Sequence, residues 1–162
     1  MIKEFQGDYR FLSNFWMVPV DVDGVTYPSA EHAYQASKTD SRQHKMQIKA
    51  CKTPGQAKRL GKTVPLRTGA TLPQVKLDAM RRIVLAKFQQ NAFIRRALLD
   101  THPQQLQEGN TWGDRFWGIC RGEGENNLGK ILVEVREQLR QEQIKQSGLI
   151  AQANFEQDHE ND

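Results

Sequence analysis

A glycine-rich segment with two tryptophans constrains this chain more than any other feature. Six of its twelve glycines and two of its three tryptophans lie between Gly109 and Gly129, in the sequence GNTWGDRFWGICRGEGENNLG. Glycine allows the backbone to approach a ligand closely or to turn through positive φ, and tryptophan adds a rigid flat face. Flexible linkers are normally Gly/Ser mixtures without indoles. The segment therefore predicts a built site rather than a linker.

Length and composition indicate one ordinary soluble domain. A chain of 162 residues can bury a core but is short for two domains. Hydrophobic residues make up 38% and charged residues 26%, and no apolar run approaches the roughly 18 to 20 residues of a membrane span. The N-terminal sequence lacks the features of a secretory signal, so we expect a cytoplasmic protein. In that compartment Cys51 and Cys120 are expected to be free thiols.

Charge is distributed unevenly along the chain. The net charge is +4, but residues 150–162 contain four acidic residues and no Lys or Arg, so residues 1–149 carry four units more, +8. A basic body can bind phosphates or nucleic acid, and an acidic tail can compete for the same surface. A solvated basic surface and a frayed terminus explain the pattern equally well. We therefore divide the chain into a domain over residues 1–149 and an acidic, flexible tail over residues 150–162.

Hydrophobic periodicity predicts a mainly helical domain. Caps and apolar spacing predict helices over residues 28–38 with Ser29 as the N-cap, from Ser41, from Thr53, over residues 75–91, and from a cap at Asn91. The strongest pattern predicts a core-facing helix that begins as the glycine segment ends, with apolar residues at Leu128, Ile131, Leu132, Val135 and Leu139. Residues 18–27, with Asp23-Gly24 in the middle, are typical of a hairpin. We predict a mainly α (α+β) fold, a single compact helical domain with a small β-hairpin.

Several familiar chemistries are excluded by spacing. The four histidines have no HExxH or similar arrangement, so no metal site is expected. The sequence GENNLGK at residues 124–130 begins like a phosphate-binding P-loop, but Ile131 stands where Mg²⁺ requires a Ser or Thr hydroxyl. Glu123 and Glu125 would also repel a triphosphate there. No GxSxG or Cys–His signature predicts acyl transfer.

Carboxylates beside aromatic side chains are the remaining candidates. Glu31 lies in the first turn of a predicted helix, close to Tyr34, and Asp114 lies between Trp112 and Trp117. Hydrolysis of a glycosidic bond develops positive charge on the sugar, so a carboxylate can stabilise it or activate water while an indole stacks the departing base. Structural explanations exist too. An acid in a first turn favours the helix dipole, and an aspartate that precedes an arginine can form an exposed ion pair.

Ordered sequence motifs resemble those of the NADAR family. They cover roughly residues 9–140, and together they are more specific than any single motif. The matching segments are FLSNF at residues 11–15, SAEHAYQA at 29–36, VKLDAM at 75–80, and DRFWG at 114–118 with GENNLG at 124–129. The resemblance implies N-glycosidase chemistry. Known members cleave the bond between base and ribose in early riboflavin intermediates, and others remove ADP-ribose from guanine in nucleic acid.

Carried over by position, the resemblance places the chemistry at Glu31 and Asp114. The residues expected to bind substrate are Trp117, Trp112, Asn14, Lys76, Asn126 and Tyr34. For Asn126, capping of the last helix is the simpler expectation, since an asparagine at a helix start usually accepts backbone N–H groups. The sequence Ile-Cys-Arg at residues 119–121 replaces a run that is richer in glycine and aspartate in the family, and this departure bears on the substrate.

The resemblance, together with these residues, implies an N-glycosidase that hydrolyses the bond between a nitrogenous base and C1′ of a ribose phosphate. Riboflavin-pathway ribosylamino-pyrimidines are the expected substrates. One of Glu31 and Asp114 would polarise water while the other stabilises the oxocarbenium-like sugar, with no metal or cofactor. Two alternatives stay open: an ADP-ribosyl hydrolase that acts on guanine of nucleic acid, and a non-catalytic module that binds ADP-ribose, a nucleotide or nucleic acid. No membrane partner is expected.

Overall fold

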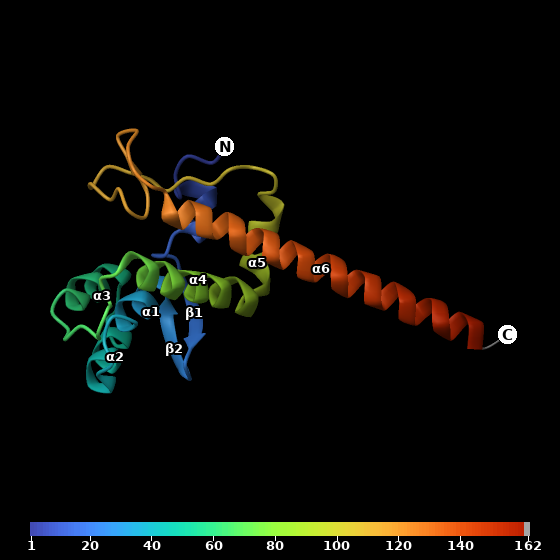
Figure 1. Cartoon of the computed structure of the whole chain (residues 1–162), viewed down its shortest axis with the longest axis horizontal. Coiled ribbons are helices and arrows are strands. Elements are labelled where there is room, and N and C mark those ends of the chain that lie inside the picture. The colour runs from blue at the N-terminus through green and yellow to red at the C-terminus, as the bar shows by residue number, and fades with distance from the viewer. Residues whose placement is uncertain (161–162) are drawn as a thin grey trace.

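A computed structural model describes residues 1–160. Its elements in chain order are the 3₁₀ helix η1 (Gly7–Leu12), β1 (Met17–Val22), β2 (Val25–Ser29), α1 (Ala30–Ala36), α2 (Arg42–Lys49), α3 (Pro54–Gly61), α4 (Pro73–Gln90), α5 (Ala92–Asp100), β3 (Gly109–Asn110), β4 (Ile119–Cys120) and α6 (Asn127–Glu160) (Figure 1). The predicted mainly helical fold with a small hairpin is confirmed.

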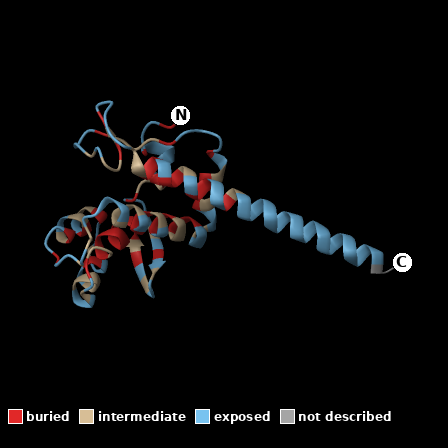
Figure 2. Ribbon diagram, in the orientation of Figure 1, coloured by how far each residue is buried: buried red, intermediate tan, exposed pale blue. Residues whose placement is uncertain are grey.

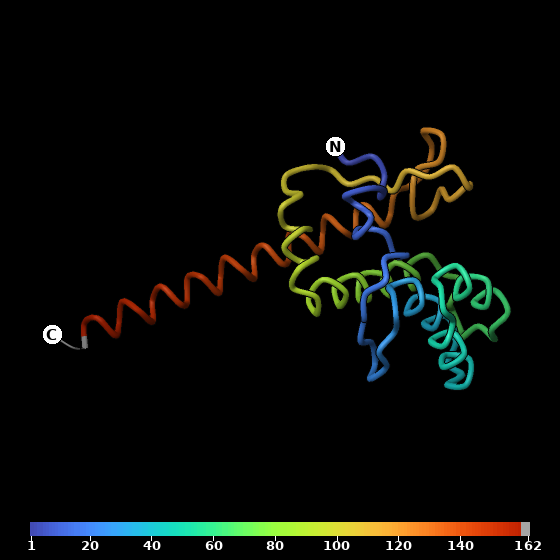
Figure 3. The backbone as a smooth tube through the Cα atoms, turned by 180° about the vertical axis from the view of Figure 1, so that it is seen from behind, coloured from blue at the N-terminus to red at the C-terminus, as the bar shows by residue number. Residues whose placement is uncertain are grey.

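Helix α4 is the centre of the domain. It contacts β1 and α1 on the side of the hairpin, and α5 and α6 elsewhere. Helix α1 in turn contacts α2, α3 and both strands of the hairpin. Seen from behind in Figure 3, the loops between α5 and α6 lie above α3 and the start of α4. The domain therefore has a lower layer of α1–α4 with the hairpin, and an upper layer of loops with the first part of α6 (Figure 1).

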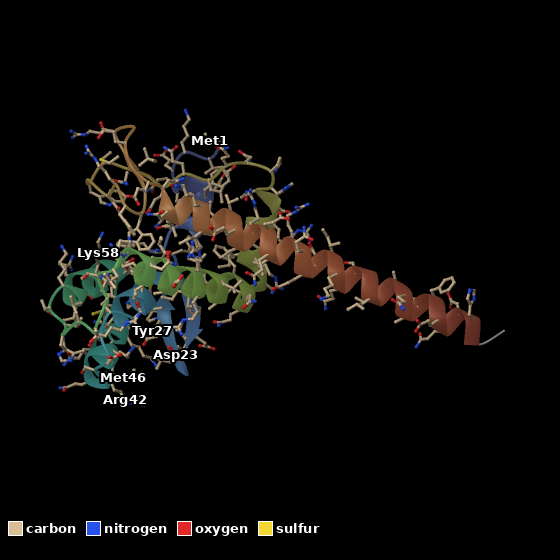
Figure 4. All side chains as sticks on the ribbon, in the orientation of Figure 1. Met1, Asp23, Tyr27, Arg42, Met46 and Lys58 are labelled. Carbon is tan, nitrogen blue, oxygen red and sulfur yellow. The ribbon has the colours of Figure 1, made fainter. Side chains whose placement is uncertain are left out.

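The hairpin forms where Asp23-Gly24 predicts it. Strands β1 and β2 pair antiparallel, with Val20 opposite Tyr27, and Asp23 and Tyr27 are labelled on it in Figure 4. Asp23 and Gly24 both have positive φ, 51° and 79°. Two positive φ angles are what a tight turn needs to match the twist of its strands.

Side-chain caps start three of the helices as predicted. The hydroxyls of Ser29, Ser41 and Thr53 accept hydrogen bonds from backbone N–H groups at the starts of α1, α2 and α3. The cap predicted at Asn91 is wrong in its chemistry. Asn91 occupies the cap position of α5, but its side-chain amide donates to the carbonyls of Pro19 and Lys87 and accepts no cap hydrogen bond. Its partners belong to β1 and α4, so the residue joins elements instead of capping α5.

The first half of α6 closes the core. The five apolar residues predicted to face inward are each at most 4% exposed: Leu128, Ile131, Leu132, Val135 and Leu139. Beyond this stretch the helix projects away from the body and is coloured as exposed (Figure 2). Among the described residues, no helix is both long and apolar enough to cross a membrane. Both cysteines are free thiols.

The segment expected to be a flexible tail is helical up to Glu160. Two side-chain pairs within the helix favour this conformation. The Gln152 amide donates to the Glu156 carboxylate at 3.0 Å, and the Phe155 and His159 rings meet edge to face at 4.2 Å. Such pairs, four residues apart, stabilise a helix without tertiary contacts. Residues 161–162 lie outside the described structure, and the domain boundary at residue 149 stays a prediction.

Candidate active site

A cavity of about 930 Å³ brings most of the predicted site residues together. Its walls come from residues 13–16, α1, α3, residues 64–76 and residues 108–117. Seven of the eight predicted residues line it: Asn14, Glu31, Tyr34, Lys76, Trp112, Asp114 and Trp117. The cavity is thus lined by part of the glycine segment that the sequence singles out, together with three acidic side chains, six aromatic side chains and five cations.

Glu31 enters the cavity from a buried helix. All seven residues of α1 are buried, and Glu31 is 7% exposed. Its Oε1 accepts a hydrogen bond of 2.8 Å from the Gln35 amide, one turn along. Burial raises the pKa of Glu31, and the charge of Asp114 adds to that effect, while Gln35, Lys58 and Lys38 oppose it. Glu31 is therefore a carboxyl group whose proton is held more tightly than in water.

The surroundings of α1 hold Glu31 in place. The buried His32 ring pairs with Ser29 Oγ at 2.6 Å and with the Cys51 carbonyl at 2.9 Å, which fixes the start of α1 against the end of α2. The backbone N–H of Glu31 donates to the Asn14 carbonyl at 3.0 Å. A Cβ at Gly61 would collide with the Gln35 side chain, so only glycine leaves room for the amide that binds Glu31.

Asp114 organises the glycine segment. Its Oδ1 accepts hydrogen bonds from the backbone N–H groups of Phe116 and Trp117 at 3.2 and 2.8 Å. The Asn110 side chain bonds both the N–H and the carbonyl of Asp114. The exposed ion pair considered for Asp114 is made by other residues, because Arg115 pairs with Glu123 at 3.0 Å. Asp114 therefore lines the cavity in a fixed position.

Aromatic rings form one wall of the cavity. Trp117 meets Tyr34 edge to face at 5.4 Å and Phe116 at 4.7 Å. Burial raises the pKa of Tyr34, and the charges of Glu31 and Asp114 add to the effect, so this ring carries a neutral hydroxyl. Trp112 is 60% exposed at the rim. An indole at the rim and another in the wall suit stacking of a flat base.

Cations surround the same space. The lining cations are Arg10, Lys38, Lys58, Lys62 and Lys76. Lys76 Nζ lies 3.8 Å from the centre of the Phe116 ring, and Lys58 lies on the side of α3 that faces the loops above it (Figure 4). Burial lowers the pKa of Lys38, while Glu31 acts in the opposite direction. Ammonium and guanidinium groups around an aromatic wall can bind the phosphate of a nucleotide.

Asn126 is the predicted site residue that lies elsewhere. Its Oδ1 accepts from the Glu108 N–H at 3.0 Å, and its Nδ2 donates to the Leu106 carbonyl at 3.0 Å. Neither bond goes to the start of α6, and Asn126 itself does not line the cavity, although its partner Glu108 does. The side chain, on a residue with a φ of 54°, joins residues 106–108, just before β3, to the end of the glycine segment.

The sequence analysis missed two ionisable residues, the half-buried Glu108 and the fully buried Lys87. Glu108 lines the cavity, and burial, followed by the charges of Asp114 and Glu31, raises its pKa to about 8. Lys87 is 1% exposed and donates to the carbonyls of Phe11 and Ser13 at 2.7 and 2.9 Å, next to Asn14. The position of Glu108 immediately before the glycine segment is a weak signal for it. Lys87 has no signal, because a lysine on a helix is normally solvated.

Within the described residues, no group of three or more His, Cys, Asp or Glu side chains is arranged to hold a metal ion. The cavity lining brings carboxyl groups together with aromatic faces and cations. This combination suits the cleavage of a bond from a sugar to a nitrogenous base, where charge develops on the ring.

Comparison with known proteins identifies the family of this chain. The model of the NADAR domain matches residues 2–140. N-glycosidase YbiA of Escherichia coli is 41% identical over 135 residues, 82% of each chain. N-glycosidase Npun_R5314 of Nostoc punctiforme is 36% identical over 136 residues, 82% of this chain and 86% of that protein. A riboflavin biosynthesis protein of Vibrio vulnificus is 35% identical over 135 residues, 83% of this chain and 36% of that protein.

A solved structure of a relative has the same fold. The NMR structure of E. coli YbiA superposes with a TM-score of 0.77 and 37% identity, and the match covers 89% of each chain. The predicted family, fold and enzyme class are thus confirmed together. The chain belongs to the NADAR domain family, and its relatives there include hydrolases of N-glycosyl bonds.

Proposed function

We propose that this protein hydrolyses the bond between a nitrogenous base and C1′ of a ribose phosphate, and that ribosylamino-pyrimidine intermediates of riboflavin biosynthesis are its substrates. The observation that carries the proposal is that Glu31 and Asp114 face one cavity with the Trp117 ring and a group of lysines. The substrate class is supported by the relative named as a riboflavin biosynthesis protein.

In the proposed mechanism, residues on different walls of the cavity have different roles. Lys58 and Lys62 on and beside α3 bind the phosphate, and Trp117 stacks on the base. Glu31 and Asp114 share the remaining tasks, of which one is to polarise a water molecule against C1′ and the other to stabilise the positive charge of the sugar. The Gln35 amide and the backbone N–H groups of the glycine segment hold the two carboxyl groups in place.

A second candidate substrate, ADP-ribosylated guanine in nucleic acid, is favoured by two observations. The cavity volume of about 930 Å³ is near the upper end of the range for small-molecule sites, about 300 to 1,000 Å³. Its five lining cations also outnumber its three carboxyl groups, and a diphosphate carries more negative charge than one phosphate. Both substrates are cleaved at an anomeric carbon bonded to nitrogen, so the same carboxyl groups serve.

Turnover assays test the proposal. Wild-type protein, the Glu31→Gln variant and the Glu142→Gln variant are incubated with riboflavin-pathway ribosylaminouracil phosphates and with ADP-ribosylated guanosine, and release of base or sugar phosphate is followed. Glu142 is exposed on the projecting part of α6 and serves as the matched control. We expect turnover of the ribosylaminouracil phosphate by wild type and the control, and loss of turnover in Glu31→Gln.

Other outcomes would revise the proposal in defined ways. Turnover of ADP-ribosylated guanosine alone would replace the substrate and keep the mechanism. Tight, salt-sensitive nucleotide binding without any turnover would identify a binding module, because phosphate contacts release counterions. Full turnover by Glu31→Gln would remove Glu31 from the chemistry.

A further inference from the structure

Glu108 faces the same cavity as Glu31 and Asp114, but its carboxyl group has a different environment. Oε2 of Glu108 is buried and has no hydrogen-bond partner among the described residues. By contrast, Glu31 accepts from Gln35, and Asp114 accepts from two backbone N–H groups. An ionised carboxylate without a donor is costly to bury, whereas the neutral acid is much less so.

The backbone of Glu108 is fixed on both sides. Its N–H donates to Asn126 Oδ1 at 3.0 Å, and its carbonyl accepts from the Ile119 N–H at 2.8 Å. A Cβ at Gly118 would collide with the same carbonyl, so the glycine segment packs directly on the Glu108 backbone. The backbone that carries the Glu108 side chain is therefore held firmly in the cavity wall.

The charged groups around Glu108 act mainly in one direction. Burial has the largest effect and raises the pKa of Glu108 to about 8, and the negative charges of Asp114 and of Glu31 on α1 add to it. Lys58 on α3 opposes them. At neutral pH the carboxyl group therefore keeps its proton while it faces the substrate space, as required of a general acid.

We propose that Glu108 is the general acid that protonates the departing base, an inference that rests on the proposed N-glycosidase function. The bond from C1′ to nitrogen breaks, its electron pair goes to nitrogen, and nitrogen takes the Glu108 proton. The oxygen of a water molecule bonds to C1′, and its proton goes to the carboxylate that activates it. The activating carboxylate releases this proton to solvent and Glu108 takes one up from solvent, so both groups return to their starting states and one water is consumed for each free base and sugar phosphate.

Kinetics of the Glu108→Gln variant test the assignment, with Glu142→Gln as the matched control. Glutamine keeps the size of the side chain but has no carboxyl proton to transfer. We expect kcat to fall by about 10²- to 10⁴-fold, the usual contribution of a general acid, with product affinity unchanged. On 4-nitrophenyl riboside 5-phosphate, whose leaving group departs without a proton, the deficit should shrink to about tenfold or less, since no acid is needed.

The pH profile gives a readout that a structural role would not move. The wild-type kcat should decline as the pH rises through about 8, because the acid loses its proton, and this decline should be absent from the residual activity of Glu108→Gln. Equal losses on both substrates, or an unchanged decline at high pH in Glu108→Gln, would overturn the assignment.

A titration of the wild type keeps the test independent of whether the variant folds. Carbon-13 NMR of side-chain carboxyl groups in the ligand-free protein, with the Glu108 signal assigned, should show this carboxyl group titrating near pH 8. Titration of Glu108 near the ordinary value of a glutamate would overturn the proposal. If wild type cleaves a substrate and Glu108→Gln keeps its rate, the role of Glu108 alone fails. If wild type cleaves none of the substrates, the proposed function fails and the role of Glu108 fails with it.

Discussion

Replacement of the buried Lys87 by methionine gives a sharp test of the electrostatics of this fold. Lys87 lies in α4 with its side chain 1% exposed, and burial lowers its pKa to about 7. Its Nζ donates to the carbonyls of Phe11 and Ser13, in the segment that immediately precedes Asn14, a residue of the cavity lining. A neutral amine still has two N–H groups for these bonds.

The lowered pKa of Lys87 sets the sign and size of the change in stability with pH. Between pH 7 and the ordinary lysine value of 10.5, the unfolded chain binds more protons than the folded protein, so the free energy of unfolding rises with pH. From about pH 7 to about pH 9.5, a shift to a pKa of about 7 corresponds to a gain of about 3 kcal/mol. This contribution is absent when residue 87 cannot ionise.

Urea unfolding at the two pH values measures the effect. At about pH 9.5, Lys87→Met should be less stable than wild type by about 2 to 4 kcal/mol, because two carbonyls lose their donor. At about pH 7 the two proteins should have similar stability, since the neutralisation cost in wild type offsets its hydrogen bonds. Lys145→Met, on the exposed part of α6, should keep the wild-type pH dependence. If the stability of Lys87→Met rises with pH as much as that of wild type, Lys87 is not the source of the pH dependence.

Three further predictions concern the glycine segment and the helices. Gly61→Ala should lower kcat and destabilise the fold by about 1 to 3 kcal/mol, because the added methyl displaces the Gln35 amide. Its control is Gly148→Ala, where the space around the residue is open and the substitution should stabilise the fold by about 0.5 to 1 kcal/mol. Equal melting temperatures for the two variants would contradict the prediction. Asn126→Ala should cost about 2 to 3 kcal/mol in urea unfolding, since two hydrogen bonds and a favourable residue at positive φ are lost together; a change below about 0.5 kcal/mol would count against it. Removal of residues 150–162 should leave turnover and melting temperature unchanged, and a loss of either would move the domain boundary.

Local patterns predicted the elements well. The caps at Ser29, Ser41 and Thr53 and the positive-φ turn at Asp23-Gly24 depend on neighbours within a few residues, so the sequence contains all that decides them. The apolar stripe of α6 was also predictable, because one helix face repeats at a fixed period.

Asparagine positions were harder to interpret for the opposite reason. Asn91 was predicted to cap α5 and bonds Pro19 and Lys87, and Asn126 was predicted to cap α6 or hold the ligand and bonds the backbone before β3. An amide can serve a local cap or a distant carbonyl equally well. Which partner it takes depends on what the fold brings within about 3 Å.

The sequence by itself determined the helical fold class, the family, and the choice of Glu31, Asp114 and Trp117 as residues of one site. Motif order and local periodicity are properties of the chain, so they can be recognised without coordinates. Only the tertiary structure showed that the pKa values of Glu108 and Lys87 are shifted. Their pKa shifts come from burial, and for Glu108 also from the charge of Asp114 and from that of Glu31, which is distant in the chain. Desolvation depends on everything that packs around a group, and no stretch of sequence contains that information.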